Sequence, residues 1–195
     1  MDPQDTSLPD ASVRARQAPL RSRYLHEPAQ AQVTDLAWTC GEGGLHSPMH
    51  GRVHFGSHAT AQVDYGVHHA IGGTHDGPVP GDLLCAALAS CQESSLRMVA
   101  AVLGVQLLEL QVGVRGHVDV RGTLGDALVP VAFQSFEVSV RLRAAPGTPP
   151  HHLRQLHRAA ERSCVVLQTL RSGVPVAVEL DAAAAEPTFH QGAMP

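Results

Sequence analysis

The sequence predicts an α+β domain, and three observations lead to this fold class. Residues 81–104 are almost wholly small and apolar, without an interior Gly or Pro, which indicates a helix. Residues 147–173 place apolar side chains at helical spacing and indicate a second helix. Residues 107–125 and 135–144 alternate apolar and polar residues, as half-buried strands do. The resulting order of strands, helix, two strands, helix and strand is typical of the α+β class.

The two ends of the chain are predicted to lie outside this domain. Residues 1–30 are rich in Pro, Arg and Gln, which predicts an N-terminal arm or short helix. Residues 183–195 predict a loose C-terminal tail. Residues 31–182 then form one domain, which is long enough to bury a core.

Turn and cap residues set the boundaries of the elements. Residues 31–40 and 51–66 have strand composition interrupted by Gly-rich turns. The first helix has Asp82 near its start, and Gly104 suits its C-terminal cap. The second helix follows a Thr-Pro-Pro signal and ends at Gly173, after which the stretch VPVAVEL predicts a closing strand.

Charge and hydropathy exclude several classes of partner. The net charge is −4 and all 14 basic residues are Arg, so there is no basic footprint for nucleic acid. We find no apolar run long enough to cross a membrane and no signal peptide, so we expect neither a nucleic-acid nor a membrane partner. A cytoplasmic location is expected, where thiols are normally kept reduced.

The cysteines stand in the most apolar segments of the chain. There are four, Cys40, Cys85, Cys91 and Cys164. Cys85 and Cys91 cannot pair, because six helical residues rise ~9 Å and a disulfide allows roughly 7 Å between Cα atoms. Cys91 and Cys164 lie on the apolar faces of two different helices, and a contact between these helices could bring them together. Each is either a small core residue or a redox-active thiol.

Three motifs resemble the OsmC/Ohr superfamily. They are GDLLCAALASCQESSLRMVAAVLGV, then GHVDVRGTLG, then CVVLQTLRSGVPVAVEL, and the resemblance covers roughly residues 30–182. It implies an OsmC-like fold, in which antiparallel sheets wrap around two central helices that carry the cysteines. It also implies an intertwined homodimer with active sites at the dimer interface.

The same resemblance implies a thiol peroxidase that reduces organic hydroperoxides in oxidative-stress defence. Cys91 would attack the peroxide and become a sulfenic acid, and Cys164 would resolve it as a Cys91–Cys164 disulfide. A dithiol reductant, lipoyl-type in the family, would reopen the disulfide. No cofactor is implied.

The chain departs from the family at the groups that activate the thiol. Peroxidases of the family use an Arg before the first helix, held by a Glu near the start of that helix. Here Gly81 stands at the Glu position and Asp82 occupies an acidic position of the pattern, while Arg52, His68 and His69 are the candidate supporting cations. The alternative is therefore an OsmC-fold protein that binds a small apolar ligand without peroxidase activity.

The sequence also contains four histidines at regular spacing, which we call the histidine ladder. His46, His50, His54 and His58 recur every four residues, and on a strand neighbouring members stand ~13 Å apart. Two such neighbours cannot share a metal held at about 2.1 Å per nitrogen. A metal site would need His68, His69 or His75 from another segment. Solvated histidines are therefore favoured and no metal is expected. A metal-binding module is the third hypothesis for the function.

Overall fold

The computed structural model describes residues 11–39, 47–56 and 61–182. Its elements, in chain order, are α1 (Ala11–His26), η1 (Pro28–Ala31), β1 (Ala37–Thr39), β2 (His50–Phe55), β3 (Ala61–Gly66), η2 (His69–Ile71), α2 (Pro80–Leu103), β4 (Leu107–Val118), β5 (Phe133–Ala144), α3 (Pro150–Ser163) and α4 (Val165–Ser172). The predicted α+β class is confirmed. Among the helices of these ranges, none is both long and apolar enough to cross a membrane.

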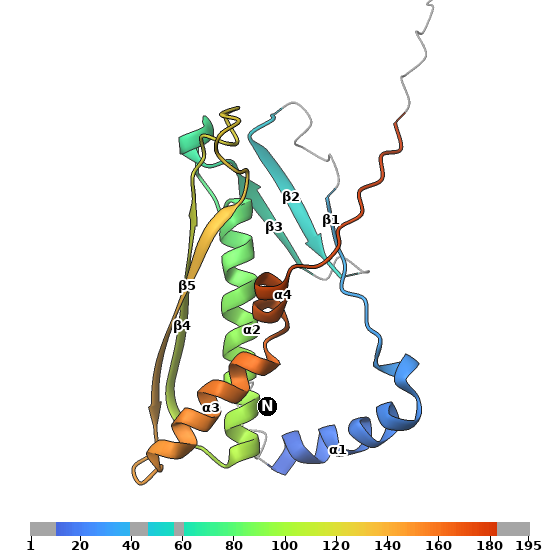
Figure 1. The fold of residues 1–195 in the computed structure, drawn as a ribbon, viewed down its shortest axis with the longest axis vertical. Coiled ribbons are helices and arrows are strands. Elements are labelled where there is room, and N and C mark those ends of the chain that lie inside the picture. The colour runs from blue at the N-terminus through green and yellow to red at the C-terminus, as the bar shows by residue number, and fades with distance from the viewer. Residues whose placement is uncertain (1–10, 40–46, 57–60, 183–195) are drawn as a thin grey trace, which may run out of the picture.

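Helix α2 is the axis around which the other elements are arranged (Figure 1). The long antiparallel ribbon β4–β5 runs beside it, and α3 and α4 follow the ribbon and pack on α2. The sheet β1–β2–β3 is antiparallel throughout and is hydrogen-bonded to neither strand of the ribbon. The described chain therefore has two separate sheets with open edges.

The ends of α2 are fixed by local sequence signals. Pro80 occupies the first turn, and the backbone N–H of Val79 donates to the Asp82 carboxylate over 3.0 Å. At the other end Gly104 adopts φ 68°, a left-handed conformation that glycine tolerates best. The predicted helix of residues 81–104 is confirmed to within one residue at each end.

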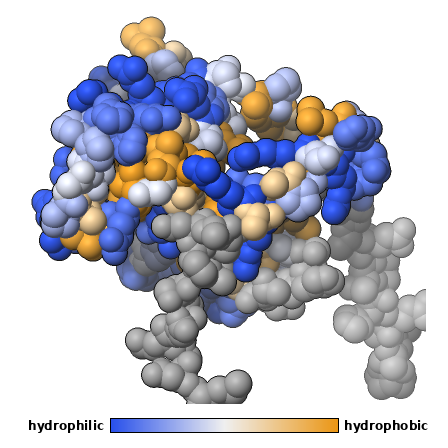
Figure 2. All heavy atoms as spheres, turned by 90° about the horizontal axis from the view of Figure 1, so that it is seen from below, coloured by the Kyte–Doolittle hydropathy of each residue, from blue (hydrophilic) through white to orange (hydrophobic). Residues whose placement is uncertain are grey.

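The core lies between α2, α3 and the ribbon. Its buried cluster consists of Leu96, Ala100, Val105, Leu156 and Ala160. The inward face of the ribbon packs on this cluster through pairs such as Leu110 opposite Leu142. Within the described residues only eight apolar side chains are buried, and seen from below the surface shows apolar side chains among the hydrophilic ones (Figure 2). That core is small for a domain of this length.

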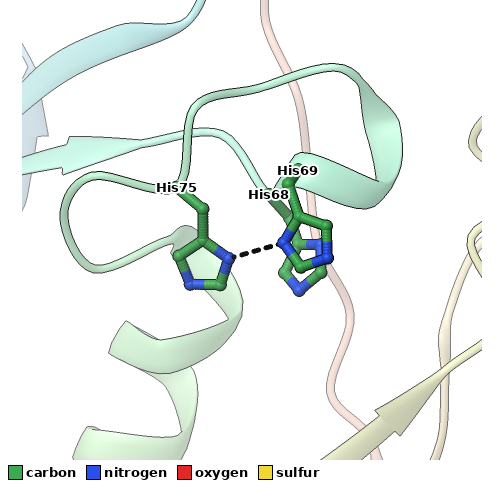
Figure 3. Close-up of side chains that lie close together, drawn as sticks. All are labelled: His68, His69 and His75. Atoms are coloured by element: carbon green, nitrogen blue, oxygen red, sulfur yellow. Dashed lines mark hydrogen bonds between the residues drawn. The ribbon is translucent and has the colours of Figure 1, made fainter.

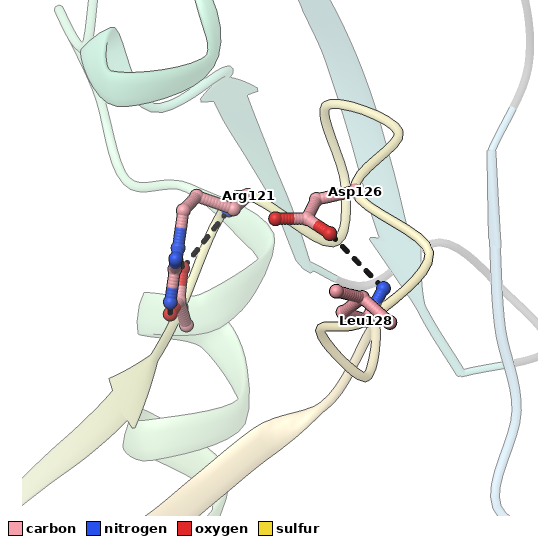
Figure 4. A network of polar contacts seen from close by, with 4 residues as sticks. Arg121, Asp126 and Leu128 are labelled. Carbon is pink, nitrogen blue, oxygen red and sulfur yellow. Dashed lines mark hydrogen bonds and ion pairs between the residues drawn. The ribbon is translucent and has the colours of Figure 1, made fainter.

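The loop between β4 and β5 is held by its own polar groups (Figure 4). The Arg121 guanidinium binds the carboxylate of Asp119, with Nη2 to Oδ2 at 2.5 Å. Further on, the N–H of Leu128 donates to Asp126 Oδ1 over 3.0 Å. These short-range polar contacts help to order the connection.

Three elements differ from the prediction. The second helix is broken at Cys164, whose ψ of 103° interrupts the chain between α3 and α4. Ser163 and the β-branched Val165 and Val166 beside it are weaker helix formers. The stretch 174–180 is not a strand, because no other part of the described chain pairs with it. The predicted strand of residues 31–40 shrinks to β1, whereas β2 and β3 confirm the pair expected in residues 51–66.

Candidate active site

Two cysteines far apart in sequence meet at the centre of the fold. Cys91 lies in the middle of α2, and Cys164 occupies the junction of α3 and α4. Cys164 is completely buried, Cys91 is partly exposed, and neither is in a disulfide. The two side chains are close enough for Cys91 to act on the ionisation of Cys164 by a side-chain hydrogen bond and by charge. The pair that the motifs indicated is thus assembled by the packing of α4 on α2.

The break between α3 and α4 determines which groups affect the pKa of the Cys164 thiol. Burial raises the pKa of the Cys164 thiol, and the neighbouring Cys91 sulfur raises this pKa further. The backbone N–H groups of Leu167 and Val166, in the first turn of α4, act in the opposite direction. Cys164 is therefore a thiol that keeps its proton at neutral pH. Cys91 is the member of the pair that a solute can reach.

The buried face of α2 explains the partial exposure of Cys91. Leu88, Gln92, Ser95 and Leu96 form this face at helical spacing. Cys91 is one turn beyond Leu88 and one turn before Ser95, at the edge of the face. Gln92 is buried, and its side-chain Oε1 has no hydrogen-bond partner in the described part of the chain. An unpaired polar atom in an interior is unfavourable, and no motif of the sequence predicts it.

The guanidinium group proposed as an activating cation, that of Arg52, is bound to a carboxylate. Arg52 on β2 pairs across the sheet with Asp64 on β3, with Nε to Oδ1 at 2.5 Å, and the hydrogen bond from Arg52 lowers the pKa of Asp64. Arg97 lies 3.6 Å from Glu93 one turn earlier on α2. Glu93 therefore faces Arg97.

The other predicted supporting residues gather at the start of α2. His68 and His69 lie with His75 in a three-histidine cluster in the loop between β3 and α2 (Figure 3). Asp82 Oδ2 lies 3.9 Å from His75 Nε2. Burial lowers the pKa of His68, and the charges of His69 and His75 lower it further. Asp82 is nine residues before Cys91, about 13 Å along the helix axis, so this cluster is a separate feature.

Only part of the histidine ladder falls in the described residues. His46, His58 and Cys40 lie outside the described residues. His50 binds the Asp76 carboxylate, with Nε2 to Oδ2 at 3.0 Å, and His54 is buried in a ring stack with Trp38. Of the two described ladder residues, His54 thus packs on Trp38 and His50 binds a nearby carboxylate.

Residues 73–179, which include both cysteines and α2, match the family model for OsmC-like proteins. The chain belongs to the OsmC-like family. The match spans more than half of the sequence and confirms the resemblance drawn from the cysteine motifs. A comparison with curated proteins finds no significant match.

Solved structures agree with this assignment at the level of the fold. An organic hydroperoxide resistance protein OsmC from Legionella pneumophila is 22% identical, with a TM-score of 0.50 over 72% of this chain and 90% of that one. An OsmC-like protein of unknown function from Vibrio cholerae is 10% identical, with a TM-score of 0.57 over 71% and 94%. An OsmC-like protein from Mycoplasma pneumoniae is 13% identical, with a TM-score of 0.54 over 73% and 89%. The OsmC-like fold is thereby confirmed.

Near the start of α2, this OsmC-like chain has Gly81 where the resemblance placed a glutamate. A Cβ added at Gly81 would lie 3.2 Å from Cζ of Phe133, and the Phe133 ring packs on Phe136 with centroids 4.7 Å apart. Cys85 lies one turn on, where burial raises the pKa of its thiol. The Phe133 ring, itself packed on Phe136, therefore lies against the position at which the resemblance placed a glutamate.

A hollow of about 320 Å³ lies on the ribbon, lined by Gln111, Gly113, Ser139, Val140 and Arg141. Most of these residues alternate with the side chains that pack on the core, so they belong to the outer face of the ribbon. The hollow therefore opens away from α2 and its thiols.

Proposed function

We propose that this OsmC-like protein is a cysteine-based peroxidase that reduces organic hydroperoxides to alcohols in oxidative-stress defence. The observation that carries the proposal is the contact between Cys91 and Cys164 with unequal exposure: one thiol can be reached by a solute, and the other is buried beside it. The description of the Legionella relative as an organic hydroperoxide resistance protein supports the same reaction class.

The reaction balances with these two thiols and one external dithiol. The Cys91 thiolate attacks the terminal oxygen of ROOH, the O–O bond breaks, and the alkoxide leaves as ROH after taking a proton. Cys91 is then a sulfenic acid. The Cys164 sulfur attacks it, the S–OH bond breaks and water leaves, giving the Cys91–Cys164 disulfide. A dithiol, lipoyl-type by family resemblance, exchanges with this disulfide and returns both thiols.

The surroundings of Cys91 favour alkyl hydroperoxides as substrates. Leu88 and Leu96, on the buried face beside it, are fully or almost fully enclosed. An apolar setting gives binding energy to a bulky alkyl group and little to hydrogen peroxide.

We further propose that the protein works as an intertwined homodimer. Residues 174–180 are extended, and their even-numbered side chains are exposed: Val174 by 59%, Val176 by 80%, Val178 by 88% and Leu180 by 88%. A period-two apolar row with an unpaired backbone is the pattern of a strand without its sheet. The open edges of both sheets and the small core indicate that a second copy supplies the pairing.

The test is oxidation of the reduced full-length protein by one equivalent of cumene hydroperoxide, followed by mapping of disulfides by digestion and mass spectrometry. The wild type is expected to form a stoichiometric Cys91–Cys164 bridge that dihydrolipoamide reopens. Cys164→Ser should stop at the Cys91 sulfenic acid, trapped by dimedone, and Cys91→Ser should not react. Cys85→Ser is the matched control on the same helix and should behave as the wild type.

A second candidate function is binding of a small apolar ligand without peroxidase activity. The aromatic pair Phe133 and Phe136 against Gly81 favours it, because it replaces a charged group with apolar surface at the start of α2. Slow oxidation spread over all cysteines, with no Cys91–Cys164 bridge, would refute the peroxidase and leave this function. Cumyl alcohol should then raise the melting temperature equally in wild type and Cys91→Ser.

A further inference from the structure

We propose that the three-histidine cluster, His68, His69 and His75, binds a divalent transition-metal ion, with Zn²⁺ as the preferred ion and water as the remaining ligand. The proposal does not rest on the peroxidase chemistry. The ligand atoms of the three side chains all lie within 4.8 Å of one another, although six residues separate His69 from His75. Figure 3 shows the rings of His68 and His69 side by side and the ring of His75 facing them.

The loop that carries the cluster is folded back on itself by backbone hydrogen bonds. The N–H of His75 donates to the carbonyl of Val67 over 3.1 Å, and the N–H of Gly73 donates to the carbonyl of His68 over 3.1 Å. A Cβ at Gly73 would lie 2.0 Å from the Val67 carbonyl oxygen, so only glycine allows this close approach. The backbone therefore holds the three histidines together before any ion binds, which lowers the entropy cost of binding.

The spacing of two of the ring nitrogens suits a tetrahedral ion. Nδ1 of His69 and Nδ1 of His75 are 3.3 Å apart. Zinc binds imidazole nitrogen at about 2.0–2.1 Å, and at the tetrahedral angle two such ligands stand about 3.3 Å from each other. The distance between these two nitrogens therefore matches one shared ion, which would replace the hydrogen bond between them.

The second nitrogen of His75 faces a carboxylate. Nε2 of His75 lies 3.9 Å from Oδ2 of Asp82, which is itself fixed by the N–H of Val79. A metal-bound histidine commonly directs its other nitrogen to a carboxylate, which sets the tautomer and strengthens the ligand. At 3.9 Å the contact with Asp82 is longer than a hydrogen bond and acts by charge, while Nδ1 of His75 lies on the side of His69.

His68 is the weakest of the three ligands. Its Nδ1 accepts a hydrogen bond from the N–H of Ala70 over 3.0 Å, which caps the short helix η2. A neutral imidazole has one acceptor nitrogen, so His68 can bind a metal only if it releases Ala70. Metal binding should therefore change the environment of the Ala70 amide, a signature that a purely structural cluster would not give.

The donor set defines the class of ion. Imidazole nitrogen suits Zn²⁺, Co²⁺, Ni²⁺ and Cu²⁺, whereas Mg²⁺ and Ca²⁺ require oxygen ligands. Three histidines and an open position form a common Zn²⁺ arrangement.

The experiment uses the reduced full-length protein, stripped of metal with a chelator. Zn²⁺ binding is measured by calorimetry, and Co²⁺ binding by absorption, where a thiolate ligand would add a sulfur-to-metal charge-transfer band. His69→Ala and His75→Asn are the main variants; Asn is chosen because His75 has φ 52°, which Asn tolerates. The control is the double variant His151→Ala and His152→Ala, another pair of adjacent histidines in ring contact. Circular dichroism checks that each variant is folded.

We expect one Zn²⁺ per chain with a dissociation constant of about 1 µM or tighter. His69→Ala and His75→Asn should each weaken it by at least about 100-fold, and Asp82→Asn, which keeps the cap oxygen, by about 10–100-fold. His68→Ala should weaken it less than either main variant, and the control should not change it. The proposal is overturned by binding that His69→Ala and His75→Asn leave unchanged, by Co²⁺ spectra with thiolate bands alone, or by Mg²⁺ binding as tightly as Zn²⁺.

Discussion

The exposed apolar row at residues 174–180 gives the sharpest test of the proposed assembly. We choose the double substitution Val176→Asp and Val178→Asp, because these side chains are 80% and 88% exposed in the single chain. Nearly all of their surface is therefore available for burial against a second copy. Little of their surface is covered by the described chain, so the monomer should keep its fold.

The magnitude follows from the area that the two valines would bury. Full burial of a valine side chain contributes about 1.5–3 kcal/mol, and both copies of the dimer carry the pair, so the four valines contribute about 6–12 kcal/mol to association. At about 1.4 kcal/mol per tenfold change, the dimer dissociation constant should rise by at least about 10⁴-fold. Two carboxylates in an apolar interface add a further desolvation cost of the same sign.

The assay is light scattering coupled to size exclusion over a series of protein concentrations. The wild type should keep the mass of a dimer where the double variant has the mass of a monomer. Leu128→Asp is the matched control, since Leu128 is 93% exposed but lies in the loop between β4 and β5. A monomeric wild type, or a double variant that dissociates no more readily than the wild type, would refute the reasoning.

Two further predictions concern the single chain. Leu156→Ala should lower the free energy of unfolding, measured in urea, by about 2–5 kcal/mol, because Leu156 is 1% exposed in the core between α2 and α3. Leu153 is only partly buried, so Leu153→Ala should lower this free energy less. Equal losses would contradict the assigned core. Burial raises the pKa of Cys164, so as pH rises the unfolded chain releases the thiol proton before the folded chain does. The free energy of unfolding of the reduced protein should therefore fall as pH rises above about 8.5, by at most about 1.4 kcal/mol per pH unit. Urea unfolding of the reduced protein across this range should show a steeper fall for wild type than for Cys164→Ala, and parallel curves would contradict it.

The parts of the fold that depend on short-range signals could be predicted from the sequence. The bounds of α2 follow from Pro80, Asp82 and Gly104, each of which acts within one helical turn. The strands β4 and β5 follow from their alternation, because one face of each packs on the core. The contact between Cys91 and Cys164 was expected only as a possibility of helix packing, and the family motifs supplied the pairing.

Other features depend on contacts that no local pattern contains. The break at Cys164 is one residue wide and lies within a segment of good helical periodicity, so spacing alone predicts a continuous helix. The segment 174–180 has the pattern of a strand, but a strand also requires a partner, which the single chain does not provide. The three-histidine cluster depends on the fold-back at Gly72 and Gly73, which spacing along the His ladder does not show.

The position of the cluster also decides whether its metal could act as an activating cation for Cys91. Asp82, beside the cluster, is about 13 Å along the axis of α2 from Cys91. A ligand must come within about 2.1 Å of Zn²⁺, so Cys91 cannot coordinate the ion. The Debye length at physiological salt is about 8 Å, which leaves little of the ionic charge at the partly exposed thiol. The rate at which cumene hydroperoxide oxidises Cys91 should therefore be the same with and without Zn²⁺ in this range of salt. A Zn²⁺-dependent rate that His75→Asn abolishes would show instead that the two centres act together.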